Sequence, residues 1–322
     1  MTTYTVIPDA DIEPDKPIKS STAFALRDNL IAVVEGDPTA PKINFAALSI
    51  GGKGIDGDLN DAASFSVMGF FDFLSMSITA VKTLPVVTVL RVNGNAALSS
   101  VITVSTQSRT VATNTSERAQ AQAWLNGIMG NAGGEDATQG AGGGSIGAGG
   151  DFGANAGGAA IPITAASRPW VLRRPLLGGN GGKQSGGNAG KEWGPGGGAV
   201  VLIVEGNIDC TGGEITADGG HTNDQGAGTN QPGGGGGGSI LVICTGTITG
   251  GTFRARGGKG NDTNGSGGGG GGGLVLLVAS AYAGTQTLDV VGGTSGGSAG
   301  AAGHSSSATL TADQIRTILQ RL

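Results

Sequence analysis

Glycine is concentrated in one part of this chain, and that placement limits what the chain can fold into. Of the 66 glycines, 59 lie in residues 127–303, 7 lie in residues 1–126 and none follows. Glycine does not recur at every third position and only 11 prolines are present, so a collagen triple helix does not fit. Apolar residues inside the glycine-rich part form dense blocks, which favours a folded body over a disordered tract.

Three apolar blocks in the second half of the chain repeat one another. Each begins with a glycine pair, at Gly197, Gly237 and Gly272, and continues with six apolar or small residues. Their length, β-branched content and flanking glycines predict buried strands rather than helices. A second short strand is predicted after each block, over residues 214–217, 252–256 and 287–291.

An earlier passage fits the same template, because residues 89–95 align with residues 201–207 and residues 102–105 with residues 215–218. The later blocks start 40 and 35 residues apart. Such spacings are typical of stacked repeats, in which neighbours bury a stripe that no single unit can bury. We therefore predict a mainly β fold with a β-solenoid or β-helix-like body.

The long glycine-rich returns between the blocks leave two interpretations open. Glycine segments in a polyproline-II-like conformation can pack closely because no Cβ intervenes, and they would then form ordered, polyglycine-II-like layers. The alternative is a set of loops, although long coil returns are unusual in compact proteins because ordering them costs entropy.

Short helices are predicted at both termini and at one junction. Residues 23–34 carry an amphipathic pattern, and residues 116–126 form a second candidate at the composition boundary. Near the C-terminus, Thr311 as N-cap and Gln314 at N3 predict a capping box, with Leu310 and Ile315 as a hydrophobic staple. That last helix is expected either to cover the last repeat or to bundle in a trimer.

The N-terminal residues resemble a known segment. The run Ile12-x-Pro14-Asp15-x-Pro17-Ile18 is followed by Leu26-Arg27-Asp28-Asn29, Ala32, Glu35-Gly36 and Ala40-Pro41. It resembles the N-terminal segment of many tail-fibre and other tail-associated proteins of tailed bacteriophages. The glycine-rich units also resemble those of phage fibres and adhesins, some of which have polyglycine-helix layers in their receptor-binding tips.

The resemblance implies a virion appendage, a homotrimer whose N-terminus binds other phage tail proteins. The residues that would attach it are Pro14, Asp15, Pro17, Leu26, Arg27, Asp28, Asn29, Glu35 and Gly36. The expected domains are an attachment segment (1–45), a first β region with the junction helix (46–126), the glycine-rich solenoid body (127–303) and a C-terminal capping helix (304–322).

Charge and hydropathy exclude several partners. The net charge is −5 and the pI is about 5.0, so there is no global basic field to attract nucleic acid. The acidic start is unlike a signal peptide, and no apolar run reaches membrane-spanning length. We expect a protein made in the host cytoplasm without a signal peptide, with no membrane insertion.

Aromatic and basic side chains stand out from the glycine background in one stretch. The candidate contact residues are Arg168, Trp170, Arg173, Arg174 and Trp193. Such residues are typical contact anchors, and a host glycan or outer-membrane protein could meet them. The competing interpretation is that the segment packs against a neighbouring subunit or the flank of the body.

Catalysis is not expected. A glycan-cleaving spike would need paired carboxylates, for which the candidates are Glu205, Asp209, Glu214 and Asp218. The equivalent residues of the next unit are Thr245, Thr249, Thr252 and Arg256, so no carboxylate ladder emerges. His221 and His304 are interpreted as exposed loop residues, and Cys210 and Cys244 as buried small apolar residues.

No cofactor or metal is predicted. Lys183 and Lys191 follow glycines but lack the remaining residues of a phosphate-binding loop. Residues 51–56 and 257–262 begin like the calcium-binding Gly-Gly-x-Gly-x-Asp repeat, but neither copy occurs in tandem, so turn formation is the better account.

The sequence therefore predicts a structural and adhesive virion protein, a tail fibre or tail-tip appendage. The alternatives are a purely architectural baseplate, collar or head-fibre component, a β-helical glycan-degrading tail spike, and an ice-binding or extracellular matrix protein.

Overall fold

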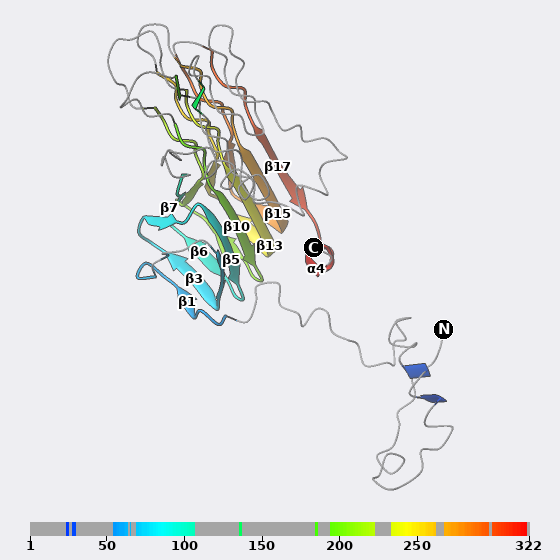
Figure 1. The fold of residues 1–322 in the computed structure, drawn as a ribbon. Helices are drawn as coiled ribbons and strands as arrows, with labels where there is room; N and C mark the ends of the chain where they lie inside the picture. Colours follow the sequence, from blue (N-terminus) through cyan, green and yellow to red (C-terminus); the bar gives the residue numbers. More distant parts are fainter. Residues whose placement is uncertain are drawn as a thin grey trace. The chain divides into compact units, whose positions relative to one another are not determined.

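The computed structural model describes the chain in separate stretches (Figure 1): residues 24–25, 28–29, 54–63, 65, 69–106, 135–136, 184–185, 194–222, 233–261, 267–295 and 298–320. The chain divides into two compact units, Met1–Leu48 and Ser49–Leu322. In the first unit, residues 24–25 and 28–29 are helical, inside the predicted helix 23–34. The rest of that helix and the predicted helix 116–126 lie outside the described residues.

Strands dominate the second unit, so the predicted mainly β class is confirmed. In chain order they are β1 (Asp58–Leu59), β2 (Gly69–Phe73), β3 (Ser75–Ile78), β4 (Lys82–Leu84), β5 (Val87–Val92), β6 (Ala96–Leu98), β7 (Val101–Val104), β8 (Glu135–Asp136), β9 (Gln184–Ser185), β10 (Ala199–Val204), β11 (Ile208–Asp209), β12 (Glu214–Thr216), β13 (Ser239–Thr249), β14 (Thr252–Arg254), β15 (Leu274–Ala283), β16 (Thr287–Asp289) and β17 (His304–Thr309). The helix α4 (Ala312–Gln320) follows β17.

Every pairing between the described strands is parallel. The larger sheet, called sheet A here, contains two rows. The first row is β2-β5-β10-β13-β15-β17, and the second is β1-β3-β6-β11 continued by the second halves of β13 and β15. Sheet B has the order β16-β14-β12-β7-β4. The chain visits these rows in turn, and we call each visit a pass.

The strand register confirms the alignments made from the sequence. Val89 pairs with Val201, and Ile102 pairs with Ile215. The two predicted regions on either side of residue 126 therefore share both sheets, even though residues 105–198 separate β7 from β10. The boundary at residue 126 itself lies outside the described residues.

Two of the predicted strands are longer than expected. The apolar blocks that begin β13 and β15 continue to Thr249 and Ala283, where the third pass has two strands, β10 and β11. Their pairing shifts register between Cys244 and Thr247. Such an irregularity bends a strand without ending it, so one strand serves two rows.

The core fills the space between sheets A and B with side chains from alternate strand positions. On sheet A, Leu90, Leu202 and Leu277 lie in one inward row, with Val242 between the last two. On sheet B, Phe253 is fully buried. Stacking equivalent residues from successive passes produces this continuous apolar interior.

The first pass closes its end of the core with aromatic and basic side chains. Phe65 meets Phe71 edge-on with ring centroids 4.8 Å apart, and Phe71 stacks on Phe73. The buried Lys82 donates from Nζ to the backbone oxygen of Asp61 at 2.8 Å and also to that of Ala63. These hydrogen bonds offset the free-energy cost of burying the ammonium group.

The C-terminal helix packs on the outer side of sheet A, over β13 and β15. Ile315 is 1% exposed and lies in a cluster with Val201, Leu241 and Ile243. The predicted capping box is confirmed, because Thr311 N donates to Gln314 Oε1 at 2.9 Å and Gln314 N donates to Thr311 Oγ1 at 3.2 Å.

The described glycine segments before β10, β13 and β15 are buried, and the glycine segments hydrogen-bond to one another. Gly194 and Gly197 donate to the carbonyls of Gly233 and Gly236 in the next pass. Other donors in the same segments bond across to the outgoing chain, as when Gly235 N donates to Gly220 O at 3.1 Å. Bonds of each kind recur every third residue, the period of a polyproline-II-type helix.

Contact with neighbouring backbone is what requires glycine in these segments. A Cβ added to Gly270 would lie 1.9 Å from the carbonyl oxygen of Gly235, and one added to Gly258 would lie 1.9 Å from that of Gly220. Real Cβ atoms do not approach backbone so closely. Gly212 differs, since its φ of 74° favours glycine in a turn that has open space around it.

Asparagine side chains link the passes at the turn between the two rows of sheet A. Asn95 Oδ1 accepts from Asn207 N at 2.8 Å, and Asn207 Oδ1 accepts from Thr247 N at 2.9 Å. A Cβ at Gly206 would lie 2.3 Å from Asn95 Oδ1. In each repeated turn, the glycine of one pass thus makes room for the asparagine amide of the preceding pass.

Candidate functional site

The outer face of sheet B carries the main polar network of the described residues. Alternation along the strands points Ile215 and Phe253 into the core, so Thr216, Arg254 and Asp289 lie in one outward row. Glu214 lies one outward position earlier on β12. Charged side chains of opposite sign therefore meet on neighbouring strands.

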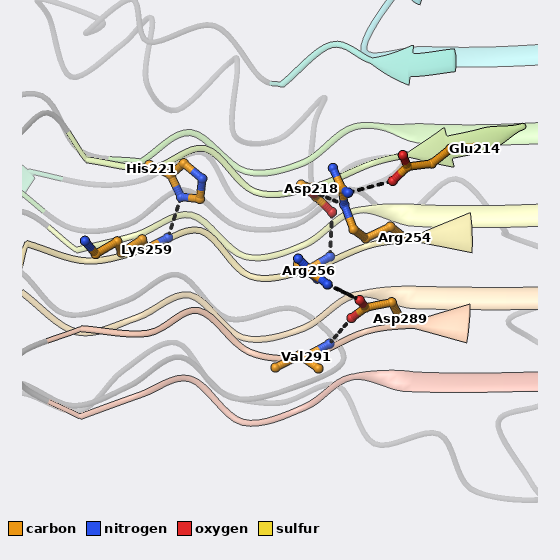
Figure 2. A network of polar contacts seen from close by, with 8 residues as sticks. All are labelled: Glu214, Asp218, His221, Arg254, Arg256, Lys259, Asp289 and Val291. Atoms are coloured by element: carbon orange, nitrogen blue, oxygen red, sulfur yellow. Dashed lines mark hydrogen bonds and ion pairs between the residues drawn. The ribbon is translucent and has the colours of Figure 1, made fainter. Parts of the chain in front are cut away.

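Ion pairs join three successive passes on this face (Figure 2). Arg254 lies 2.6 Å from Glu214 Oε1, a contact outside hydrogen-bond geometry, and donates from Nε to Asp218 Oδ2 at 2.7 Å. Arg256 donates from its backbone N to Asp218 Oδ1 at 2.8 Å, and its guanidinium pairs with Asp289. That pairing holds the pKa of Asp289 below its usual value.

The polar face continues toward the glycine segments at His221. Its Nδ1 accepts from the backbone N of Lys259 at 2.8 Å (Figure 2). His221 is exposed, as expected, but this bond gives the ring a fixed partner on the next pass. The loop interpretation of His304 is wrong, because His304 begins strand β17 and is half-buried.

All four carboxylates proposed for a glycan-cleaving site have structural partners. Glu205 pairs with Arg316 of α4 at 2.6 Å, which anchors the helix to the end of β10. Asp209 Oδ1 accepts from Thr211 N at 2.9 Å in a turn, and the contacts with Thr211 lower its pKa. Glu214 and Asp218 share Arg254.

The register also agrees with the residues expected on the following pass. Asp209 pairs with Thr249 and Glu214 pairs with Thr252. These two carboxylates therefore face hydroxyl side chains, Asp218 meets Arg254 and Arg256, and the arrangement is that of a cross-strand network.

Both cysteines are buried and free, which confirms their interpretation as small core residues. Burial raises the pKa of the Cys210 thiol to about 12 and that of the Cys244 thiol to about 11. Both thiols stay protonated at neutral pH and are poor nucleophiles.

The Gly-Gly-x-Gly-x-Asp turns have internal partners where the structure describes them. Asp56 Oδ2 accepts from Asp72 N at 2.6 Å, while Asp262 of the second copy lies outside the described residues. Within the described stretches, no group of three or more His, Cys, Asp or Glu side chains is placed to hold a metal ion.

The predicted contact residues Arg168, Trp170, Arg173, Arg174 and Trp193 lie outside the described residues. The same holds for the proposed attachment residues Pro14, Asp15, Pro17, Leu26, Arg27, Glu35 and Gly36. Asp28 and Asn29 are described, and both are helical and half-buried in the N-terminal unit.

Two features escaped the sequence analysis. The Arg316–Glu205 pair joins residues 111 positions apart, and no local pattern signals such a contact. The second is a group of exposed apolar residues on the first pass, among them Phe70, which is 77% exposed. The run Gly69–Phe73 shows three phenylalanines, but its alternation does not say which side faces out.

No family model, curated protein or solved structure matches this chain. Among the helices in the described stretches, none combines the length and the apolar character that crossing a membrane requires.

Proposed function

We propose that this chain is a structural virion protein of a tailed bacteriophage, a tail fibre or tail-tip appendage that takes part in host-surface attachment. The observation that carries the proposal is the division into an N-terminal unit, Met1–Leu48, and a body of strands in parallel register. The first unit contains the residues that resemble tail-associated proteins. Attachment to the particle and display to the host thus fall to separate parts of the chain.

The body is a β-solenoid with polyglycine-II-like layers. This assignment is supported by the parallel pairing of successive passes and by the three-residue spacing of the glycine hydrogen bonds. Every pass is bonded to the next through side chains and backbone. Such a body suits a rigid appendage whose role is structural and not catalytic.

The protein acts in the virion as a homotrimer. Its N-terminal residues bind other tail proteins, and its partner on the host is a cell-surface glycan or an outer-membrane protein. The trimer follows from the resemblance of the N-terminal segment, and the mass of the full-length protein in solution tests it. A monomeric mass would contradict it.

Incorporation into particles tests the attachment role. The double variant Arg27→Ala/Asp28→Ala should reduce the amount of protein in purified virions at least tenfold, while the thermal unfolding midpoint of the body stays unchanged. A matched control is Lys16→Ala/Lys19→Ala, which removes two charges outside the motif residues. Equal incorporation of both variants would contradict the attachment role.

Competition with infecting phage tests the host contact. Purified full-length protein should bind host cells and lower phage adsorption in proportion to its concentration. A protein that is incorporated into virions but never binds cells would be architectural. Release of reducing ends from host polysaccharide would instead identify a glycan-degrading spike.

A further inference from the structure

Two neighbouring residues of the third pass bind one residue of the fourth pass through both of its backbone polar groups. Lys259 N donates to His221 Nδ1 at 2.8 Å (Figure 2). Thr222 N donates in the other direction, to Lys259 O at 3.1 Å. The imidazole thus takes the place that a backbone carbonyl has between paired strands. We call these two hydrogen bonds the His221 link.

The same arrangement occurs three residues earlier with a carboxylate. Arg256 N donates to Asp218 Oδ1 at 2.8 Å, and Gly219 N donates to Arg256 O at 2.9 Å. The side-chain acceptor and its donor are 38 residues apart in both links. Three residues make one turn of a polyproline-II-type helix, so the two links repeat along one side of the segment. We call this second pair of bonds the Asp218 link.

Two asparagines make comparable contacts elsewhere in the body. Asn95 Oδ1 accepts from Asn207 N at 2.8 Å, and Asn207 Oδ1 accepts from Thr247 N at 2.9 Å. In all four cases the acceptor atom is bonded to the side-chain Cγ, and the donor is a backbone N–H of the next pass. His221 is therefore the histidine in a set whose other members are asparagine and aspartate.

The chemistry of the acceptor distinguishes His221 from the other three residues. Because the donor is a backbone N–H, the ring atom that accepts it must be an unprotonated nitrogen, so the imidazole is neutral with its proton on Nε2. A second proton binds at Nδ1 and turns this acceptor into a donor. Amide and carboxylate oxygens keep their lone pairs and remain acceptors.

Protons reach the His221 link from solvent, because the residue is exposed. Among side chains, histidine is the one that ordinarily changes charge between about pH 5 and 8, and the chain contains two, His221 and His304. The thiols of Cys210 and Cys244 stay protonated over this range, since burial raises their pKa values to about 12 and about 11. A change in this pH range therefore points to one of two imidazoles.

The described charged residues around the His221 link belong to the two segments that it joins. They are Asp218 on the third pass, and Arg256 and Lys259 on the fourth. Both carboxylate oxygens of Asp218 are occupied, Oδ2 by Arg254 Nε and Oδ1 by Arg256 N. The adjoining glycine segments, residues 194–198 and 233–238, contain no charged residue. The acid of these segments is thus committed to the Asp218 link.

We propose that the His221 link is an acid-sensitive connection between the third and fourth passes. At neutral pH the ring accepts the Lys259 N–H, and this contribution is lost as the pH falls to about 5 and the ring takes its second proton. The Asp218 link stays closed, so the strands keep their register. One end of a glycine layer then opens in acid while the body stays folded, whether or not the protein is part of a virion.

Hydrogen–deuterium exchange of single backbone amides tests the proposal on the full-length protein. Between about pH 7.5 and about pH 5, the protection of the Lys259 N–H should fall about fivefold, because one hydrogen bond is lost. The exchange rates are corrected for the intrinsic pH dependence of amide exchange. The Arg256 N–H should keep its protection, because its acceptor is the carboxylate of Asp218.

Two substitutions at His221 separate titration of the ring from loss of the contact. His221→Asn places an amide oxygen on Cγ, as at Asn95 and Asn207, so the Lys259 N–H should stay protected at both pH values. His221→Ala removes the acceptor, so the protection should be low at both. The matched control is His304→Asn, which removes the other imidazole and should leave the pH dependence of the wild type.

Several results would overturn the proposal. Protection of the Lys259 N–H that does not change with pH in the wild type would mean that the ring keeps its hydrogen bond in acid. An equal loss in His221→Asn would assign the change to another group, and its disappearance in His304→Asn would assign it to His304. An equal loss at the Arg256 N–H would show general loosening of the body instead of a local opening.

Discussion

The strands and the glycine segments differ in what lies between neighbouring layers of backbone. Strands of successive passes pair within each sheet, and side chains such as Phe253 fill the space between the two sheets. In the glycine segments, backbone meets backbone directly, and a single added Cβ at Gly270 would lie 1.9 Å from a carbonyl oxygen. The first part is stabilised mainly by removing apolar surface from water, and the second by hydrogen bonds and close contact.

The difference shows why one chain can use both. Glycine loses more backbone entropy on folding than any other residue, so an isolated glycine segment has little reason to order. Here each segment is joined directly to a strand that the core already holds in register, as at Gly198–Ala199 and Gly238–Ser239. The side-chain core aligns the backbones, and the glycine segments extend that alignment.

The largest expected loss of stability comes from making a cavity in the side-chain core between the two sheets. Phe253→Ala removes a ring that is 0% exposed and should cost about 3–5 kcal/mol of unfolding free energy in urea titrations. Val291→Ala, at a side chain 58% exposed, is the control and should change stability by under about 0.5 kcal/mol. Similar losses in the two variants would mean that the core is not packed as described.

Adding a side chain at a closely packed glycine should lower the free energy of unfolding by nearly as much. Gly270→Ala forces a methyl group onto the backbone of the neighbouring segment and should cost about 3 kcal/mol. Gly212→Ala has open space around it and bears only the strain of its φ of 74°, about 1 kcal/mol. The same urea titrations compare them, and an equal loss would break the distinction between packed and turn glycines.

The asparagine links between passes should contribute less than either packing. Asn207→Ala takes away the acceptor of Thr247 N and should cost about 1 kcal/mol. Asn207→Asp keeps an acceptor oxygen at the same place and should retain most of the stability. If both variants lose the same amount in urea titrations, the hydrogen bond is not what holds this turn.

The smallest effect concerns pH and the charged face of sheet B. Arg256 holds the pKa of Asp289 below its usual value, so the ionised carboxylate stabilises the fold above its ordinary pKa of about 4. That contribution disappears as the pH falls through the lowered value. Asp289→Asn should thus cost under about 1 kcal/mol at pH 7.

Urea titrations of both proteins over an acid series check this prediction. The difference in unfolding free energy between wild type and Asp289→Asn should shrink steadily below pH 4. A difference that stays constant with pH would assign the effect to packing and not to charge.

Local patterns predicted much of this architecture. Six-residue apolar blocks gave the strands, and the likeness of residues 89–95 to residues 201–207 gave the pairing of β5 with β10. The capping box at Thr311 was also readable, because its two hydrogen bonds lie within four residues.

What the sequence left open depends on contacts between distant residues. A run of glycines has no side-chain pattern, so whether Gly233–Gly238 is ordered is decided by the passes on either side of it. The partner of Arg316 could not be chosen among the acids of the chain, and the side of β2 that faces out could not be read from Phe70, Phe71 and Phe73. The candidate contacts around Trp170 remain predictions.

The pairing of β5 with β10 also has a consequence for the order of folding. Val87 pairs with Ala199, 112 residues later, whereas Ala199 pairs with Ser239 after 40. Closing the longer loop costs about 0.9 kcal/mol more in chain entropy. Within the first two passes the separation is shorter still, 19 residues from Phe70 to Val89. We expect the first two passes to associate as one unit and the later passes as another, and the two units to join last through β5 and β10.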